Sequence, residues 1–212
     1  MLKKIALTFV FSLCIIVGFS LIYIQQKKIN AKERIKLLQA SYSDIIGQLS
    51  IKATEFNCNN SIAMFIDFSI PSMLPRFFLV DLKNNMIISN GLVAHGQADN
   101  YTKNLDNVVF SNQPGSYCSS KGYYKTGQKY KGKWGIAYRL HGLEPSNDNA
   151  LSRAVVLHAH SCVPKAETNY FICLSQGCPT LNIDYFESIQ PFLDKENSPT
   201  LLYIYKNEIE NK

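Results

Sequence analysis

Outside its first 36 residues, this chain has no excess of charge of either sign. Residues 1–36 hold seven of the 22 basic side chains and one of the 16 acidic ones, a net charge of +6, which is also the net charge of all 212 residues. The basic residues therefore do not form a patch on a folded domain, as they do in nucleic-acid-binding proteins. Internal repeats and low-complexity tracts are absent as well, which excludes a repeat array.

The chain also lacks a cleavage site of Ala-x-Ala type after its one long apolar run. Residues 5–24 are uncharged and apolar, with Lys3 and Lys4 before them and Lys27 and Lys28 after them. This run has the length of a membrane-spanning helix, whereas a secretory signal usually has a shorter apolar region. We predict an uncleaved transmembrane anchor over residues 1–26 whose basic flanks meet anionic head groups of the cytoplasmic membrane. A cleaved signal sequence is the alternative.

Apolar side chains recur at helical spacing between residues 27 and 56, which predicts a connecting helix over this range. Asn30 and Glu33 have the spacing of a capping box at its start. A stripe of this kind usually packs against the following domain, and a coiled-coil seam that gives weak self-association is the alternative. The stripe consists of Ile35, Leu38, Tyr42, Ile45, Ile46 and Leu49.

Short runs rich in β-branched and aromatic residues dominate residues 57–207, which we predict to be one mostly β domain followed by a tail at 208–212. Lys83-Asn84-Asn85 is typical of a hairpin turn, and a short helix is expected over residues 184–193. The expected strands are 64–68, 77–82, 86–94, 136–140, 155–160 and 201–205.

Ser175-Gln176-Gly177-Cys178-Pro179 is the segment with the clearest chemical signature. A cysteine nucleophile acts as thiolate and needs a base, and His158 lies upstream in an apolar strand. Glycine beside the thiol allows a substrate carbonyl to approach, and the N–H groups of Gly177 and Cys178 are candidate oxyanion donors. The pattern therefore favours acyl transfer by cysteine. The competing interpretation is a buried cysteine in a Gly-Pro turn with a core histidine.

Strand alternation adds a second candidate chemistry. Residues two apart on a strand share a face, so His158, His160 and Cys162 are expected to face one cleft. With Cys173 or Cys178 as a further ligand, these side chains would suit tetrahedral zinc. The spacing matches no familiar zinc pattern, and we predict no metal and no cofactor.

From residue 65 to residue 205 the chain resembles the L,D-transpeptidase catalytic-domain family, the YkuD-like enzymes of bacterial murein, in the branch that carries Ser-x-Gly-Cys-Pro. Gln176 and Pro179 stand where the better-known branch has His and Asn or Arg. In chain order, the segments that carry the resemblance are Ile66-Asp67-Phe68-Ser69, Pro71-Ser72, 76–82, 92–96, Phe110-Ser111-Asn112, Pro114-Gly115-Ser116, 119–124, Thr126-Gly127, 131–135, 139–144, 153–158 and 175–179.

The resemblance implies a β-sandwich or barrel-like fold with few short helices, and roles for particular residues. Cys178 corresponds to the nucleophile and His158 to the general base, while Ser175 and Gly177 shape the cysteine loop. The candidate substrate-binding residues are His160, His95, Arg139, Arg153, Tyr124 and Gln176. For the two arginines, a role within the fold is the alternative, and for His95 and Tyr124 a place beside a backbone turn.

The same resemblance implies a substrate, peptidoglycan stem peptides, and a place in the cell envelope. Acyl transfer from a tetrapeptide stem to an amine, through a thioester, is expected, and water as acceptor would make an L,D-carboxypeptidase. An inactive murein-binding module and an assembly partner that acts through the connecting helix are the non-enzymatic alternatives. Positive charges after residue 26 would by themselves favour a cytoplasmic domain, but murein lies outside the inner membrane, so we expect the domain in the periplasm, or secreted if the N-terminus is cleaved.

Five cysteines lie beyond the apolar N-terminal run. An oxidising compartment favours two bridges and one free thiol, which would be Cys178. Our hypothesis pairs Cys162 with Cys173 and Cys58 with Cys118, and five free thiols are the alternative.

Overall fold

The structure is a computed structural model that describes residue 33 and residues 37–98, 107–195 and 198–207. The chain divides into two compact units, Met1–Ser43 and Asp44–Lys212, and we describe each by itself. The predicted anchor at 1–26, the tail at 208–212 and the Asn30 cap lie outside the described residues. In the part that is described, no helix is both long and apolar enough to span a membrane. Of the first unit, residues 37–41 are helical.

Helix α2, Ser43–Glu55, forms most of the described part of the predicted connecting helix. Its apolar stripe buries Ile46, Leu49 and Ala53, each at most 1% exposed. Lys52 and Phe56, at and just beyond its end, lie over the ring of Tyr123 in the sheet. Because these apolar side chains are already buried within the protomer, α2 packs against its own domain, and they are not available for a coiled-coil seam.

Nine strands in the described residues form one sheet in the order β3-β2-β1-β9-β5-β6-β7-β8-β4. β1 pairs in parallel with β9, and β7 with β8, whereas the other neighbours are antiparallel. The strands are β1 (Ile62–Asp67), β2 (Phe77–Asp81), β3 (Met86–Gly91), β4 (Val93–Ala94), β5 (Gly122–Gly132), β6 (Gly135–Gly142), β7 (Val156–Ala159), β8 (Thr180–Leu181) and β9 (Leu201–Tyr205).

This sheet curls toward a barrel. β3 and β4 occupy its two opposite edges, yet only Leu92 separates them in the chain. One residue spans less than 4 Å, so the two edges must come together. The mostly β, barrel-like architecture with few helices agrees with the expectation from the sequence.

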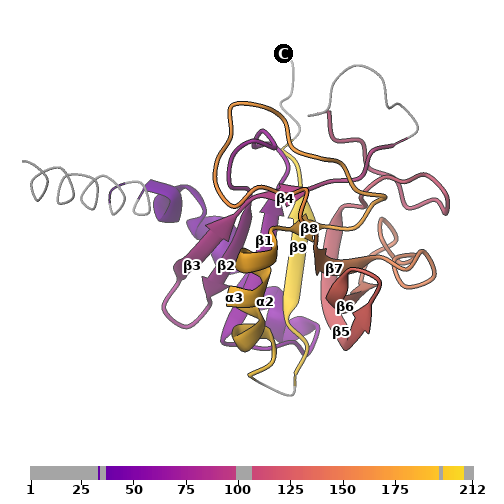
Figure 1. The fold of residues 1–212 in the computed structure, drawn as a ribbon. Helices are drawn as coiled ribbons and strands as arrows, with labels where there is room; N and C mark the ends of the chain where they lie inside the picture. The colour runs from indigo at the N-terminus through magenta and orange to yellow at the C-terminus, as the bar shows by residue number, and fades with distance from the viewer. Residues whose placement is uncertain (1–32, 34–36, 99–106, 196–197, 208–212) are drawn as a thin grey trace, which may run out of the picture. The chain divides into compact units, whose positions relative to one another are not determined.

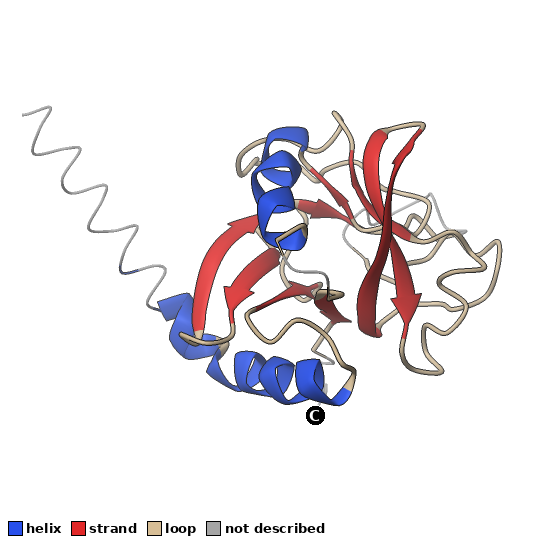
Figure 2. Cartoon of the chain, turned by 90° about the horizontal axis from the view of Figure 1, so that it is seen from below, coloured by secondary structure: helices blue, strands red, loops and turns tan. Residues whose placement is uncertain are grey.

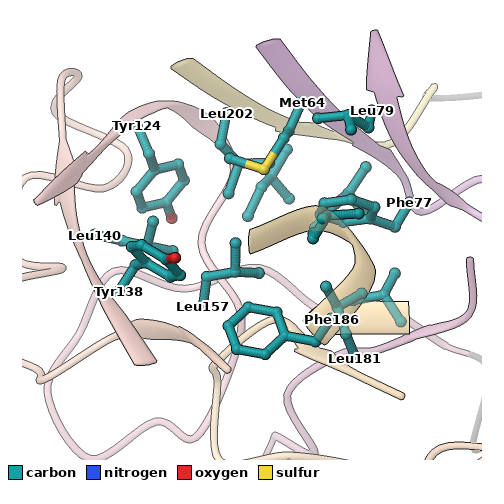
Figure 3. Close-up of a cluster of buried hydrophobic side chains, with 14 of the residues drawn as sticks. Met64, Phe77, Leu79, Tyr124, Tyr138, Leu140, Leu157, Leu181, Phe186 and Leu202 are labelled. Atoms are coloured by element: carbon teal, nitrogen blue, oxygen red, sulfur yellow. The ribbon is translucent and has the colours of Figure 1, made fainter. Parts of the chain in front are cut away.

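Helix α3, Ile183–Leu193, lies between the two arms of the curled sheet (Figure 1, Figure 2). It begins at Asn182, whose side chain accepts a hydrogen bond from the Tyr185 N–H as an N-cap. Phe186, Ile189 and Leu193 then point into the core at helical spacing. Figure 3 shows Phe186 among strand side chains that include Leu157 and Leu181. The helix therefore fills the interior of the sheet and packs against side chains of β7 and β8.

The strand predictions are right for β1, β2, β3, β4, β6, β7 and β9, and the helix over 184–193 is α3. β5, which is the longest strand, and β8 were missed. β5 contains three glycines and three lysines and lacks a β-branched run, and it is a strand because β6 and β9 supply hydrogen bonds on both sides. Two-residue β8 is too short to give a pattern.

One of the two predicted disulfides is present, Cys162–Cys173, and the other is wrong. Cys58 and Cys118 are separate, buried thiols. Cys58 follows α2, and the N–H of the next residue, Asn59, donates to the Pro199 carbonyl just before β9 begins. Cys118 instead precedes β5, whose first residue, Gly122, pairs with Ile204 near the end of β9. The two cysteines thus lie toward opposite ends of β9, too far apart for a bond.

Candidate active site

A cavity of about 540 Å³ contains the cysteine of the signature segment and the histidine of β7. Its walls come from the ends of β7 and β8, the loop of residues 173–178, and the tip of the β5–β6 hairpin. The lining residues that matter for the chemistry are Cys178, His158, Thr180, His160, Lys133 and Trp134.

The cysteine loop is closed on itself by the side chain of Ser175. Its Oγ donates to the Cys178 carbonyl at 2.7 Å and accepts from the Gly177 N–H at 3.1 Å. Gly177 has a φ of +111°, and a Cβ there would lie 2.7 Å from the Cys118 carbonyl oxygen. The loop therefore requires glycine at 177 for both conformation and space. The predicted shaping roles of Ser175 and Gly177 have a physical basis in these contacts.

Neighbouring segments hold this loop from outside. The Ser175 N–H donates to the His95 carbonyl at 2.8 Å, and Ser119 Oγ donates to the Gly177 carbonyl at 3.1 Å. Arg153 Nη2 donates to the Cys118 carbonyl at 2.7 Å and so fixes the segment on which Gly177 packs. Cys178 is consequently carried by a turn with few degrees of freedom.

The Cys178 thiol is mostly buried and accepts a hydrogen bond from the Val156 N–H, with 3.5 Å between N and Sγ. Burial raises the pKa of the Cys178 thiol, while the Val156 N–H and the Arg153 guanidinium oppose that rise. The thiol is therefore neutral at rest, and it needs a base to become a nucleophile.

His158 is one of two imidazoles that line this cavity. Its Nδ1 lies 3.1 Å from the Ala159 carbonyl and its Nε2 lies 3.0 Å from Thr180 Oγ1. Burial lowers the pKa of His158, an effect that the Ala159 carbonyl opposes and the neighbouring His160 increases. The ring is thus neutral near pH 7 and able to accept a proton. No hydrogen bond joins His158 to Cys178 in the described structure, although both line the same cavity.

His160 and Gln176 also line the cavity, as alternation and position in the loop predict. His160 lies edge-on to Trp134, with 4.6 Å between the ring centroids, and its Nδ1 accepts from the Cys162 N–H at 3.1 Å. Lys133 Nζ lies 4.6 Å from the Trp134 ring centre. The rim of the cavity therefore combines an aromatic surface with a cation.

The disulfide between Cys162 and Cys173 forms part of the cavity wall. The bond occupies Cys162, a ligand in the zinc alternative, and Cys173, one of the two candidates for its further ligand. Among the described residues, no group of three or more His, Cys, Asp or Glu side chains is arranged around a common point for a metal. The cavity is consistent with thiol chemistry by Cys178 instead.

Four predicted substrate-binding residues lie outside the cavity lining. His95 is buried, with Nδ1 2.9 Å from Arg76 Nη2, and burial together with that guanidinium lowers the pKa of His95 to about 3. Tyr124 is in the core, where its hydroxyl bonds to Ser120 and burial raises its pKa to about 12. Arg139 stacks on Tyr130, and Arg153 holds the 111–120 segment. The structure gives these side chains roles in the fold.

The cavity residues that were missed from the sequence include Thr180, Lys133 and Trp134. Thr180 follows Cys178 by two residues, but only the pairing of β8 with β7 places it beside His158. Lys133-Trp134-Gly135 has the composition of an exposed hairpin tip, and Trp134, the one tryptophan of the chain, was a detectable signal for a binding rim.

Comparisons with known proteins give the family of the chain. No curated protein matches the chain, whereas nine chains of solved structures do. They include an L,D-transpeptidase from Xylanimonas cellulosilytica, which is similar at 11% identity and a TM-score of 0.36 over 68% of this chain and 60% of that one. This chain thus spans less than two thirds of that structure. The family model of the L,D-transpeptidase catalytic domain matches residues 33–205. The chain therefore belongs to the L,D-transpeptidase catalytic domain family.

Proposed function

We propose that this protein is a murein L,D-transpeptidase that transfers an acyl group from a tetrapeptide stem to an amine through a thioester on Cys178. The observation that carries the proposal is the presence of the Cys178 thiol and the neutral His158 imidazole in one cavity of about 540 Å³. In proteins without substrate, catalytic hydrogen bonds are often long and tighten when the substrate binds. The missing contact between the two side chains is consistent with such a resting state.

In the proposed reaction, the thiol proton passes to His158 Nε2 as Sγ attacks the carbonyl of the third stem residue. The C–S bond forms, and the carbonyl electron pair moves to the oxygen. Collapse then breaks the C–N bond to the terminal D-alanine, whose amine takes the proton from His158. Because the Gly177 N–H is engaged by Ser175 Oγ, the Cys178 N–H is the remaining backbone candidate for the oxyanion. A second amine then attacks the thioester: the new C–N bond forms, the C–S bond breaks, and the amine proton passes through His158 to the Cys178 thiolate.

The charge of the cavity supports a substrate with carboxylates. Its described lining contains Lys133, His158 and His160 and no aspartate or glutamate. A stem peptide carries carboxylates near its scissile bond, and a cationic rim would attract them. Gln176 supplies an amide in the place where the better-known branch of the family has histidine.

For the location, we propose that the domain lies outside the cytoplasmic membrane, held by an anchor over residues 1–26. The disulfide Cys162–Cys173 supports this location, since such bonds persist in oxidising compartments.

The test is intact-mass analysis after incubation with a tetrapeptide muropeptide. We expect an acyl adduct on the protein and released D-alanine, both lost in Cys178→Ala. Cys58→Ala is the matched control, because Cys58 is also a free buried thiol but lies by α2; its adduct should persist.

Addition of an amine acceptor then separates transfer from hydrolysis, since a water-only reaction would identify a carboxypeptidase. Neither adduct nor D-alanine release from a folded protein would reject acyl transfer and favour a murein-binding module.

A further inference from the structure

Thr180 is the residue through which the candidate base and the candidate nucleophile are connected. Its hydroxyl oxygen lies 3.0 Å from His158 Nε2 and 3.2 Å from the Cys178 carbonyl oxygen. The residue is 3% exposed, and the parallel pairing of β7 with β8 places it opposite His158 in register. A single buried hydroxyl thus contacts both residues of the proposed chemistry.

The contact of His158 with Ala159 determines which ring nitrogen carries the proton. A carbonyl oxygen only accepts hydrogen bonds, so Nδ1, at 3.1 Å from it, must be the donor. In the neutral imidazole, Nε2 then holds a lone pair and is the acceptor. The Thr180 hydroxyl therefore donates to Nε2 in the resting protein, which holds the ring by both of its nitrogens.

Proton transfer reverses the direction of this hydrogen bond. Nε2 has a single lone pair, so the Thr180 O–H must turn away from it as the proton arrives. Both ring nitrogens are then donors, and Thr180 Oγ1 becomes the acceptor. The Thr180 O–H is then free to turn to the Cys178 carbonyl, 3.2 Å away. The charged ring gains a connected chain of hydrogen bonds from the Ala159 carbonyl to the Cys178 carbonyl. With the neutral ring, the Thr180 hydroxyl makes one hydrogen bond, to Nε2. With the charged ring it makes two, one from Nε2–H and one to the Cys178 carbonyl.

We propose that Thr180 is a positioning residue that orients His158 through Nε2 and stabilises its imidazolium by relaying a hydrogen bond to the Cys178 carbonyl. This inference rests on the proposed function in one respect, that His158 receives the thiol proton. It is a role for a residue outside the signature segment and outside the pair of Cys178 and His158.

The pH dependence of thioester formation should reveal this role of Thr180. The titratable groups that line the cavity with His158 are His160 beyond the end of β7, Cys178 in the loop, and Tyr130 and Lys133 on the β5–β6 hairpin. The substitution Thr180→Val leaves all four in place and removes only the hydroxyl. The imidazolium then loses an acceptor, so His158 should hold its proton less well.

The first experiment measures kcat/KM for thioester formation by the full chain against pH. Hydrogen bonds to charged groups have net values that correspond to roughly 10- to 100-fold in rate. We expect Thr180→Val to lower the plateau by that factor and to shift the acidic limb to lower pH, and Thr180→Ser to restore both. A purely structural defect would lower the plateau and leave the limb in place, and that result would overturn the proposal.

Thr200→Val is the matched control. Thr200 is also fully buried, next to β9, but its hydroxyl has no hydrogen-bond partner among the described residues. Its replacement removes the same group from a buried threonine without removing a contact. Activity and pH profile should stay unchanged.

The second experiment does not depend on activity. The chain has four histidines, so nitrogen-15 spectra of the full chain can resolve the tautomer and titration of His158. We expect the Nδ1–H tautomer at neutral pH and, in Thr180→Val, protonation at lower pH than in the parent.

An Nε2–H tautomer in the parent, or unchanged titration in the variant, would overturn the role of Thr180 even in an inactive protein. Conversely, absence of turnover with the expected titration would count against the proposed function alone. If Thr180→Val does not fold, the parent tautomer and the Thr180→Ser titration decide the question.

Discussion

The stability of the fold should depend on pH through His95. This side chain is 2% exposed and lies against Arg76, whose Nη2 donates to Nδ1 at 2.9 Å. Burial, Arg76 and Lys206 lower the pKa of His95 from 6.5 to about 3. Between these two values the unfolded chain binds a proton that the folded chain does not. The free energy of unfolding therefore falls as the pH drops below 6.5, and it continues to fall until about pH 3.

The size of the effect follows from the two pKa values. At pH 5 the unfolded histidine is almost fully protonated and the folded one is not, which costs about 2 kcal/mol of stability relative to pH 8. Urea unfolding of the parent and of His95→Asn, at both pH values, measures it. Asn keeps an acceptor near the position of Nδ1 and has no titration in this range, so the parent should lose about 2 kcal/mol more than the variant.

The comparison with the variant is needed because His158 has a lowered pKa too and acts in the same direction. Both proteins contain His158, and its contribution cancels in the difference. Equal losses of stability in parent and variant between pH 8 and pH 5 would refute the reasoning, because His95 would then be protonated in the folded state.

Three further changes test the packing of the fold and of the cysteine loop. Gly177→Ala should destabilise the fold by about 1–3 kcal/mol and abolish thioester formation, since its Cβ would lie 2.7 Å from the Cys118 carbonyl oxygen. Urea unfolding measures the loss of stability and intact mass the loss of the thioester, and a fully active variant would contradict the loop geometry. Thr200→Val should raise the free energy of unfolding by about 1 kcal/mol, because it removes a buried hydroxyl without a partner; a loss of stability would reveal a missed contact. Reduction of the Cys162–Cys173 bond, whose sequence separation is 11, should lower the free energy of unfolding by about 3 kcal/mol. Thermal or urea unfolding with and without reductant measures this loss, and no change on reduction would argue against the bond.

Local pattern accounted for much of the fold because most strands and α3 contain their own signal. β1, β2 and β9 are continuous apolar runs that are buried along almost their whole length, and α3 has an asparagine cap followed by apolar residues at helical spacing. Segments of this kind favour the same secondary structure in any compact fold. Local pattern failed for β5, whose glycines and lysines are held in a strand by two neighbours.

The candidate site divides in the same way. Cys178, His158 and His160 were identified from residue type and spacing and Gln176 from the family resemblance, and all four line one cavity. The fate of His95 was not foreseeable, because its burial depends on Arg76, nineteen positions away, filling the space beside it.

The sequence by itself determined the family, the mostly β composition and the pair of cavity side chains with the right chemistry, since these depend on residue identity and on spacing along the chain. Only the tertiary structure decided the partners: which cysteines bond, which predicted substrate-binding side chains are buried, and that Thr180 contacts both the His158 ring and the Cys178 carbonyl. The physical reason is that hydrogen bonds and disulfides form over a few ångströms, and distances of that size between remote residues arise only when the sheet has curled.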